Sequence, residues 1–348
     1  MFSGAIKLND PVGTQIKLEE YFEVFANDFA EIFRSFTPIA LPLSVFLCVA
    51  EIVLGVSLLT NFKRRTTIHL LFGLIIFFTF LTFYSAYFDK VTDCGCFGDA
   101  IKLTPWESFG KDILLTILIG ILMFQQSSFD NVFHKPAGML VIGFFIASVL
   151  AAVYAIQHLP FIDFRNYKVG NNIPELMKRP KVPCRMIYEM SKDGEKFVFE
   201  EYPKDKSLKL DTSYIANESE CLAKIQDYSF WSDTSDYTKE SLIGKKLLIL
   251  IQKTDSDDSE IYKQINELTK QTQELNIENV LITSVDSKTF EAFRHEQQLA
   301  MPYYFADSKL IKTIMRSRVG LTFLKDGQIM GKWHYNDIPS IEKLKELQ

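Results

Sequence analysis

The residues Asp93-Cys94-Gly95-Cys96-Phe97-Gly98-Asp99 lie between two apolar runs, 67–88 and 113–124, which contain no Asp, Glu, Lys or Arg. Uncharged runs of this kind are typical of membrane helices, so we expect the seven residues in a loop at a membrane surface. Two cysteines at positions i and i+2 can form a disulfide whose small ring is strained and readily exchanged. Gly95 has no Cβ and lets the backbone turn between them. The stretch therefore predicts thiol chemistry beside a membrane.

Two other interpretations of Cys94 and Cys96 stay open at this point. Free cysteines often behave as small buried hydrophobes, which would make both thiols inert. The pair could also be half of a metal site. A structural zinc site needs four nitrogen or sulfur ligands, and the chain has no second Cys-x-x-Cys or His pair, so we predict no metal centre.

The composition divides the chain into two parts. It has 348 residues, of which 47% are hydrophobic and 14% aromatic, and a third uncharged run covers 137–157. Residues 159–348 mix charged and apolar residues as soluble domains do. We therefore expect an α-helical transmembrane bundle in a lipid bilayer, followed by an α/β domain. The net charge of −5 argues against nucleic acid as a partner.

The first 36 residues are predicted to be helical. Residues 1–5 have the character of the last turn of an apolar helix, so we expect a further apolar segment upstream of them; the start lacks the pattern of a cleavable signal peptide. Residues 15–36 alternate aromatic and acidic side chains at helical spacing. This amphipathic helix is expected either at the membrane interface or buried against a partner.

Four membrane spans are predicted, over 39–60, 67–88, 105–124 and 137–158, and together they form a bundle over 37–158. The third span has the clearest start, because Thr104-Pro105-Trp106-Glu107 is a capping box with proline at the first helical position.

Basic residues in short loops predict the orientation. Lys63-Arg64-Arg65 and the loop 125–136 are expected in the cytoplasm, which puts 89–104 and everything after 159 on the other side. Basic residues after the last span oppose this orientation, but long translocated domains largely escape the charge rule. The prediction is a multi-pass protein of the bacterial inner membrane whose C-terminal domain is extracytoplasmic.

Ionisable residues inside predicted spans are functional candidates by default, and we single out three of them. Glu51 is in the middle of the first span, and Lys111 and Asp112 lie in the third. We expect Glu51 to face the bundle interior, either protonated or paired with Lys111, His69 or a polar ligand. The alternative is a neutral, hydrogen-bonded Glu51 that only fixes helix packing.

The N-terminal part resembles the DoxX/MauE redox-associated membrane proteins over about residues 1–158. The residues that carry the resemblance are Phe2-Ser3-Gly4 with Lys7, Asp10-Pro11, Ala50-Glu51 and the cysteine loop. The resemblance implies a small helical bundle with paired extracytoplasmic cysteines, associated with disulfide formation or electron transfer. It implies Cys94 and Cys96 as the redox pair and Glu51 as the acid within the membrane. The family would have a full first membrane helix where this sequence starts, so we expect either that the start codon is misplaced or that the helix is lost.

The soluble part is expected to contain a linker with a small β element over 159–226, and a domain over 227–348. Segments 186–188 and 197–199 flank Lys192-Asp193-Gly194 as in a hairpin. The later elements are predicted as a strand at 247–251, a helix at 259–275, a strand at 279–285, helices at 287–298 and 308–315, strands at 321–324 and up to 335, and a final helix. This order is similar to that of thioredoxin-like domains of the TlpA and peroxiredoxin kind.

That domain lacks the catalytic residues of its apparent relatives. Residues 253–258 read Lys-Thr-Asp-Ser-Asp-Asp where the family has Cys-x-x-Cys, and Val319-Gly320 occupies the place of the cis-proline. We interpret the acidic run as a solvated loop. Cys184 and Cys221 lie outside the domain, where they form a structural disulfide or where Cys184 exchanges with the Cys94/Cys96 pair.

Three functions are consistent with the sequence. The first is a thiol-disulfide oxidoreductase whose Cys94/Cys96 pair passes electrons between an envelope protein partner and a membrane acceptor such as a quinone. The second is a noncatalytic membrane scaffold whose degenerate thioredoxin-like domain binds a protein. The third is a small-solute transporter or sensor built around Glu51.

Overall fold

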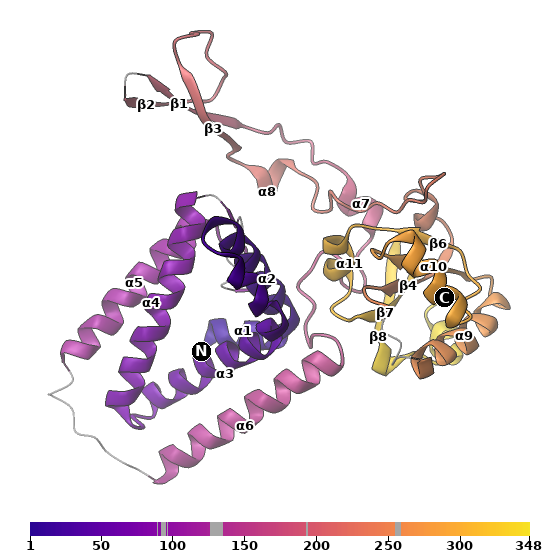
Figure 1. Ribbon diagram of the computed structural model, residues 1–348, viewed down its shortest axis with the longest axis horizontal. Helices are drawn as coiled ribbons and strands as arrows, with labels where there is room; N and C mark the ends of the chain where they lie inside the picture. Colours follow the sequence, from indigo (N-terminus) through magenta and orange to yellow (C-terminus); the bar gives the residue numbers. More distant parts are fainter. Residues whose placement is uncertain (89, 92–94, 96, 126–134, 193, 255–258) are drawn as a thin grey trace. The chain divides into compact units, whose positions relative to one another are not determined.

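The structure is a computed structural model that describes residues 1–348 except 89, 92–94, 96, 126–134, 193 and 255–258 (Figure 1). It has two compact units. The first consists of Met1–Arg165 together with two short later segments, Met315–Arg318 and Trp333–Ile338. The second consists of Asn166–Ile314, Val319–Lys332 and Pro339–Gln348.

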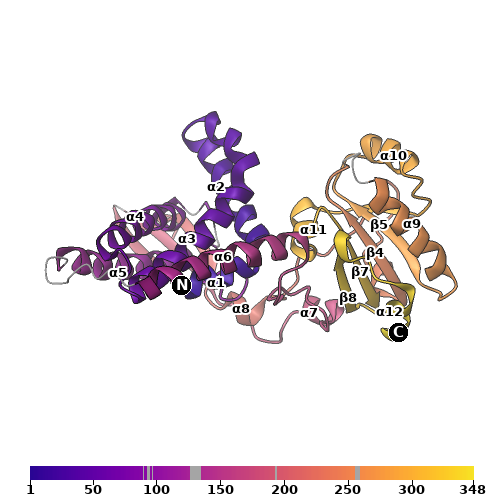
Figure 2. The ribbon, with the colours of Figure 1, turned by 90° about the horizontal axis from the view of Figure 1, so that it is seen from below.

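The first unit is helical. Its helices are α1 (Phe2–Asn9), α2 (Pro11–Asp28), the 3-10 helix η1 (Glu31–Ile39), α3 (Ala40–Leu59), α4 (Arg64–Phe88), α5 (Pro105–Phe124) and α6 (Lys135–Gln157). The α4 and α5 helices run side by side (Figures 1 and 2). The α3 helix packs against α1, α2 and α6, and the wholly buried Cys48 lies in the apolar cluster that joins α3 to α1 and α6.

The prediction of one amphipathic helix over 15–36 is wrong. The helix α2 starts earlier, at Pro11, where the Asp10 carboxylate accepts a hydrogen bond from the backbone N–H of Gly13 at 2.8 Å. It ends at Asp28, and Ala30 is extended before η1 begins. The end of α2 is held by a tertiary contact, because the hydroxyl of Tyr84 donates to the Asp28 carboxylate at 2.5 Å. Sequence periodicity does not record such a contact.

The α2 helix buries its aromatic face within the unit. Tyr21 and Phe25 pack in one buried cluster with Leu81 and Tyr84 of α4. The hydroxyl of Tyr21 also lies 2.7 Å from the hydroxyl of Ser85. This face of α2 is therefore buried against α4 of the same unit, whereas a location at the membrane interface or against a partner stays a prediction.

Three helical segments of the described residues are long and apolar enough to cross a membrane: Glu31–Leu59, Arg64–Phe88 and Pro136–Gln157. They correspond to the first, second and fourth predicted spans. The α5 helix forms at the predicted residues with both hydrogen bonds of its capping box, between Thr104 and Glu107. The α5 helix is not among the three apolar segments, because its first half carries the charged residues Glu107, Lys111 and Asp112. A membrane span over 105–124 stays a prediction.

The second unit begins with a short helix, α7 (Ile173–Met177), and a three-stranded antiparallel sheet. Its strands are β1 (Met186–Lys192), β2 (Glu195–Phe199) and β3 (Lys209–Ile215), in the order β2-β1-β3. The predicted hairpin is confirmed by the pairing of β1 with β2, whereas β3 was missed. A disulfide joins Cys184 to Cys221, at the end of α8 (Glu218–Cys221), with 5.1 Å between the two Cα atoms. This confirms the structural disulfide that the sequence offered as one alternative.

The rest of the second unit is built on a five-stranded sheet in the order β6-β5-β4-β7-β8, but the end of β8 and the following 3-10 helix η5 belong to the first unit. The elements of this part of the chain are η3 (Glu240–Leu242), β4 (Lys245–Ile251), α9 (Ser259–Gln273), β5 (Glu278–Thr283), α10 (Ser287–Glu296), β6 (Tyr303–Phe305), α11 (Ser308–Ile314), β7 (Val319–Lys325), β8 (Gln328–His334), η5 (Tyr335–Asp337) and α12 (Ile341–Glu346). Figure 2 shows α9 beside the sheet, where it packs on β5.

The predicted order of strands and helices is confirmed, with β6 as an addition. The centre of the sheet is β4, which is parallel to β5 and antiparallel to β7, and its residues from Leu247 to Ile251 are fully buried. One boundary differs. Val319-Gly320 was expected to precede the strand, but both residues belong to β7, because Val319 and Gly320 pair with Ile251 and Leu250 of β4. The expected acidic loop is described only at Lys253 and Thr254, since 255–258 lie outside the described residues.

Candidate functional site

The two predicted redox residues, Cys94 and Cys96, lie outside the described residues, but Gly95 between them is described. Its φ angle is +63°, in the left-handed region that glycine adopts without strain. A Cβ at this position would lie 3.0 Å from the Cγ atom of Lys17. Gly95 therefore makes the turn that the sequence assigned to it, packed against the stem of a lysine from α2.

Gly95 also lines a cavity of about 410 Å³ inside the first unit. The helices α1 to α5 supply the other walls. All three ionisable candidates from the sequence, Glu51, Lys111 and Asp112, line the same cavity, together with Lys7 and Lys17. Residues from separate predicted spans are thus brought to one place, next to the residue that separates the two cysteines.

Glu51 is paired, but not with the partners proposed from the sequence. The ammonium of Lys7 donates to its carboxylate, and the two side chains are only 7% and 11% exposed. Lys7 comes close because α1 packs tightly on α3: a Cβ at Gly4 would lie 2.8 Å from the Cβ of Glu51. The expected partners do otherwise, since Lys111 pairs with Asp112 and the His69 ring lies 2.7 Å from the carbonyl oxygen of Arg65.

The second charge pair belongs to α5. Lys111 donates to the Asp112 carboxylate at 2.6 Å, and the hydroxyl of Thr82 on α4 donates to the same carboxylate at 3.1 Å. Asp112 is only 1% exposed, so these two hydrogen bonds compensate for its desolvation. The Lys111 ammonium also lies 5.5 Å from the centre of the Phe97 ring, which connects α5 with the loop after Cys96.

Arg316 holds the end of the cysteine loop in place, and sequence reasoning missed it. Its guanidinium donates to the Asp10 carboxylate at 2.8 Å and to the Asp99 carboxylate at 2.9 Å. All three residues belong to the first unit. Burial alone would lower the pKa of Arg316, but Asp10 and Asp99 outweigh it and hold that pKa above its ordinary value. Asp99 and Arg316 are far apart in the chain, and no local pattern signals their contact.

The remaining cysteines are accounted for by packing and by the disulfide. Cys48 is a buried free thiol, and Cys184 and Cys221 are joined to each other. Exchange of Cys184 with the cysteine loop would therefore start with attack of a loop thiolate on this disulfide, which releases Cys221 as a thiolate. Across the described residues, no three His, Cys, Asp or Glu side chains come together in an arrangement able to hold a metal ion.

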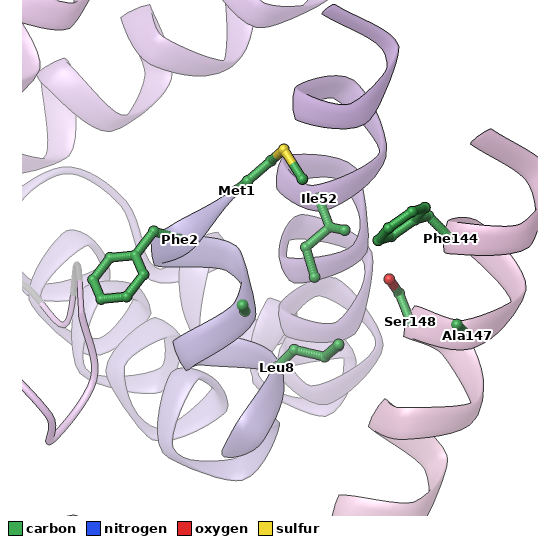
Figure 3. A pocket seen from close by; sticks show the side chains of 8 residues that line it. Met1, Phe2, Leu8, Ile52, Phe144, Ala147 and Ser148 are labelled. Carbon is green, nitrogen blue, oxygen red and sulfur yellow. The ribbon is translucent and has the colours of Figure 1, made fainter. Parts of the chain in front are cut away.

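A second groove of the first unit offers no such chemistry. It lies between α1, α3 and α6 and is lined by Met1, Phe2, Leu8, Ile52, Phe144 and Ser148, among others (Figure 3). Its volume is also about 410 Å³, but no charged side chain lines it. The two cavities are similar in size and differ in chemistry.

These features define a multi-pass membrane protein with a helical unit and a mixed α/β unit. The family model for methylamine utilisation protein MauE matches residues 1–125, which include the cavity and the cysteine loop. Among curated proteins, Protein TlpB of Flavobacterium psychrophilum is 30% identical over 106 residues, or 29% of this chain and 28% of TlpB. The chain thus spans less than a third of that relative's length. No solved structure matches the chain.

Proposed function

We propose that this protein is a membrane thiol-disulfide oxidoreductase, in which Cys94 and Cys96 exchange with an extracytoplasmic protein partner and pass the electrons to an acceptor in the membrane. The observation that carries the proposal is the position of Gly95, which lines a charged cavity within the bundle. Its covalent neighbours are the two cysteines. The match of residues 1–125 to the model for methylamine utilisation protein MauE supports the proposal, because the resemblance to that family implies an association with disulfide formation or electron transfer.

The reaction runs in two balanced halves. A thiolate of the partner attacks one sulfur of the Cys94/Cys96 disulfide, and a second partner thiol resolves the mixed disulfide. The partner leaves with a disulfide, and Cys94 and Cys96 are left as thiols. Their reoxidation releases two electrons and two protons to the membrane acceptor. A three-residue Cys-Gly-Cys ring is strained, which favours its reduction by the partner.

The contacts of Arg316 support a common side of the membrane for the cysteine loop and the C-terminal domain. Between Asp99 and Arg316 the chain passes through α5 and α6. Because these two residues touch, the chain must cross the membrane an even number of times between them. The α6 helix is apolar enough to cross, so α5 crosses as well. Together with the basic residues Lys63-Arg64-Arg65, which favour the cytoplasm, this supports our proposal that both parts lie outside the cytoplasm of a bacterial inner membrane.

The α/β domain over 227–348 binds the protein partner in this account. Its element order is similar to that of thioredoxin-like domains, but this part of the sequence contains no cysteine. A domain without a thiol cannot carry out the exchange itself. Binding of the partner by this domain would raise its effective concentration near the cysteine loop.

The test is oxidation of a reduced dithiol peptide by membranes that contain the full-length protein. We expect Cys94→Ser and Cys96→Ser each to abolish oxidation, because a single thiol cannot close the disulfide. The matched control is Cys48→Ala, which removes a buried thiol outside the exchange and leaves oxidation intact. Full oxidation by the Cys94→Ser/Cys96→Ser variant would overturn the proposal in favour of a scaffold.

A further inference from the structure

We propose that the charged cavity of the first unit binds a membrane quinone, with the quinone ring at the lysine end and the prenyl tail along the leucine wall. This inference rests on the proposed function, since it identifies the chemical class of the acceptor. It assigns a site within the helices to the step that reoxidises Cys94 and Cys96.

The polar part of the cavity suits a neutral ligand with hydrogen-bond acceptors. Lys7 is neutralised by Glu51, Lys111 by Asp112, and Lys17 by Glu20 at 2.9 Å. An anionic ligand such as a fatty acid would therefore meet no net positive charge. An ammonium has three N–H donors, so Lys7 can hold Glu51 and also donate to a ligand carbonyl. A quinone ring offers two carbonyl oxygens of this kind.

The other part of the cavity suits a hydrocarbon chain. Its walls include Leu58 of α3, Leu71 of α4, and Leu118 and Leu122 of α5. A rise of about 1.5 Å per residue separates Lys111 and Leu122 by roughly 16 Å along α5. The cavity is thus elongated, charged near Gly95 and apolar at its far end. A prenylated quinone has the same polarity along its length and is dissolved in the surrounding bilayer.

A quinone bound in this cavity would accept the electrons that the two cysteines release. Two thiols become one disulfide and release two electrons and two protons, and a quinone takes up the same number of each to become a quinol. Gly95 lines the cavity, and its covalent neighbours in the sequence are Cys94 and Cys96. The groove in Figure 3 lacks both this connection and any charged donor, which is why we assign the quinone to the first cavity.

The test separates binding from electron transfer. Decylubiquinone is titrated into the purified full-length Cys94→Ser/Cys96→Ser protein in detergent micelles, where no thiol of the loop can react. We expect saturable one-to-one binding. In the same background, Leu122→Trp fills the apolar end and should weaken binding by about tenfold or more, which is about 1.4 kcal/mol. The matched control is Ile121→Trp on the neighbouring position, which is 47% exposed and outside the cavity, and should bind as the parent does.

Each outcome decides one claim. No saturable binding, or equal weakening by Leu122→Trp and Ile121→Trp, would overturn the quinone site. If Leu122→Trp does not fold, Leu118→Phe makes a smaller intrusion from the same wall and is expected to weaken binding too. Quinone binding by a protein whose native thiols never reduce it would leave the site standing and overturn the proposed function. Dithiol oxidation without quinone binding would leave the proposed function standing and overturn the quinone site.

Discussion

The charged residues that line the cavity within the helices form ion pairs, Lys7 with Glu51 and Lys111 with Asp112. Sequence alone marked Glu51, Lys111 and Asp112 as candidates, since ionisable residues are costly in a membrane. It failed to identify Lys7 as the partner of Glu51, because the two are 44 positions apart and only the close packing at Gly4 joins them. The sequence can thus identify candidate residues, but their interaction partners follow only from the tertiary structure.

At this scale we predict that Glu51→Gln destabilises the first unit by about 3–5 kcal/mol, the usual cost of leaving one charge of a buried pair without its partner. Unfolding of the purified protein in mixed micelles measures the change. The matched control is the double variant Lys7→Met/Glu51→Gln, which removes both charges and should recover most of the loss. Equal stability of Glu51→Gln and the parent would show that the Lys7–Glu51 pair is not a buried charge pair.

Among the elements, α5 has the largest consequence for topology. If it crosses the membrane, the cysteine loop and the chain after α6 share one side; if it lies flat, they are on opposite sides. Its start could be predicted to the residue from Thr104 and Glu107, because a capping box is a local signal. Its insertion could not, because its first half carries three charges, and Asp112 among them is compensated in part by Thr82 of another helix, α4.

We predict that α5 spans the membrane. In a background with Cys48, Cys94 and Cys96 replaced, Lys102→Cys before the helix should react with a membrane-impermeant thiol reagent applied to spheroplasts. Gln125→Cys after the helix should react only once the membrane is permeabilised. Reaction of both cysteines in intact spheroplasts would mean that α5 lies in the outer interface and that the chain after α6 is not on the same side as the cysteine loop.

The other elements show the same division between local and tertiary signals. The strands β4 and β7 and the helices around them follow hydrophobic patterns and were predicted close to their observed limits. The strand β6 was missed because it has three residues and is defined by its pairing with β5. The end of α2 was misplaced because the contact between Asp28 and Tyr84 fixes it.

For the whole molecule, the cysteines have different roles in the two units. The chain has five cysteines. One is buried in the helices and two form the disulfide beside the small sheet, which leaves Cys94 and Cys96 as the pair for the proposed exchange. The sequence predicted a helical membrane part and an α/β part in this order. It did not predict that Met315–Arg318, late in the chain, belongs to the first unit. That assignment depends on contacts such as Arg316 with Asp10 and Asp99.

The most direct test of the account is the redox state of each cysteine in intact membranes, measured by differential alkylation and mass spectrometry. We predict that Cys94 and Cys96 are a disulfide in respiring membranes and become thiols when respiration is blocked and a dithiol donor is supplied. The Cys184–Cys221 disulfide should stay oxidised throughout and serves as the internal reference. Cys94 and Cys96 that keep one redox state under both conditions would contradict the central claim that this pair carries electrons.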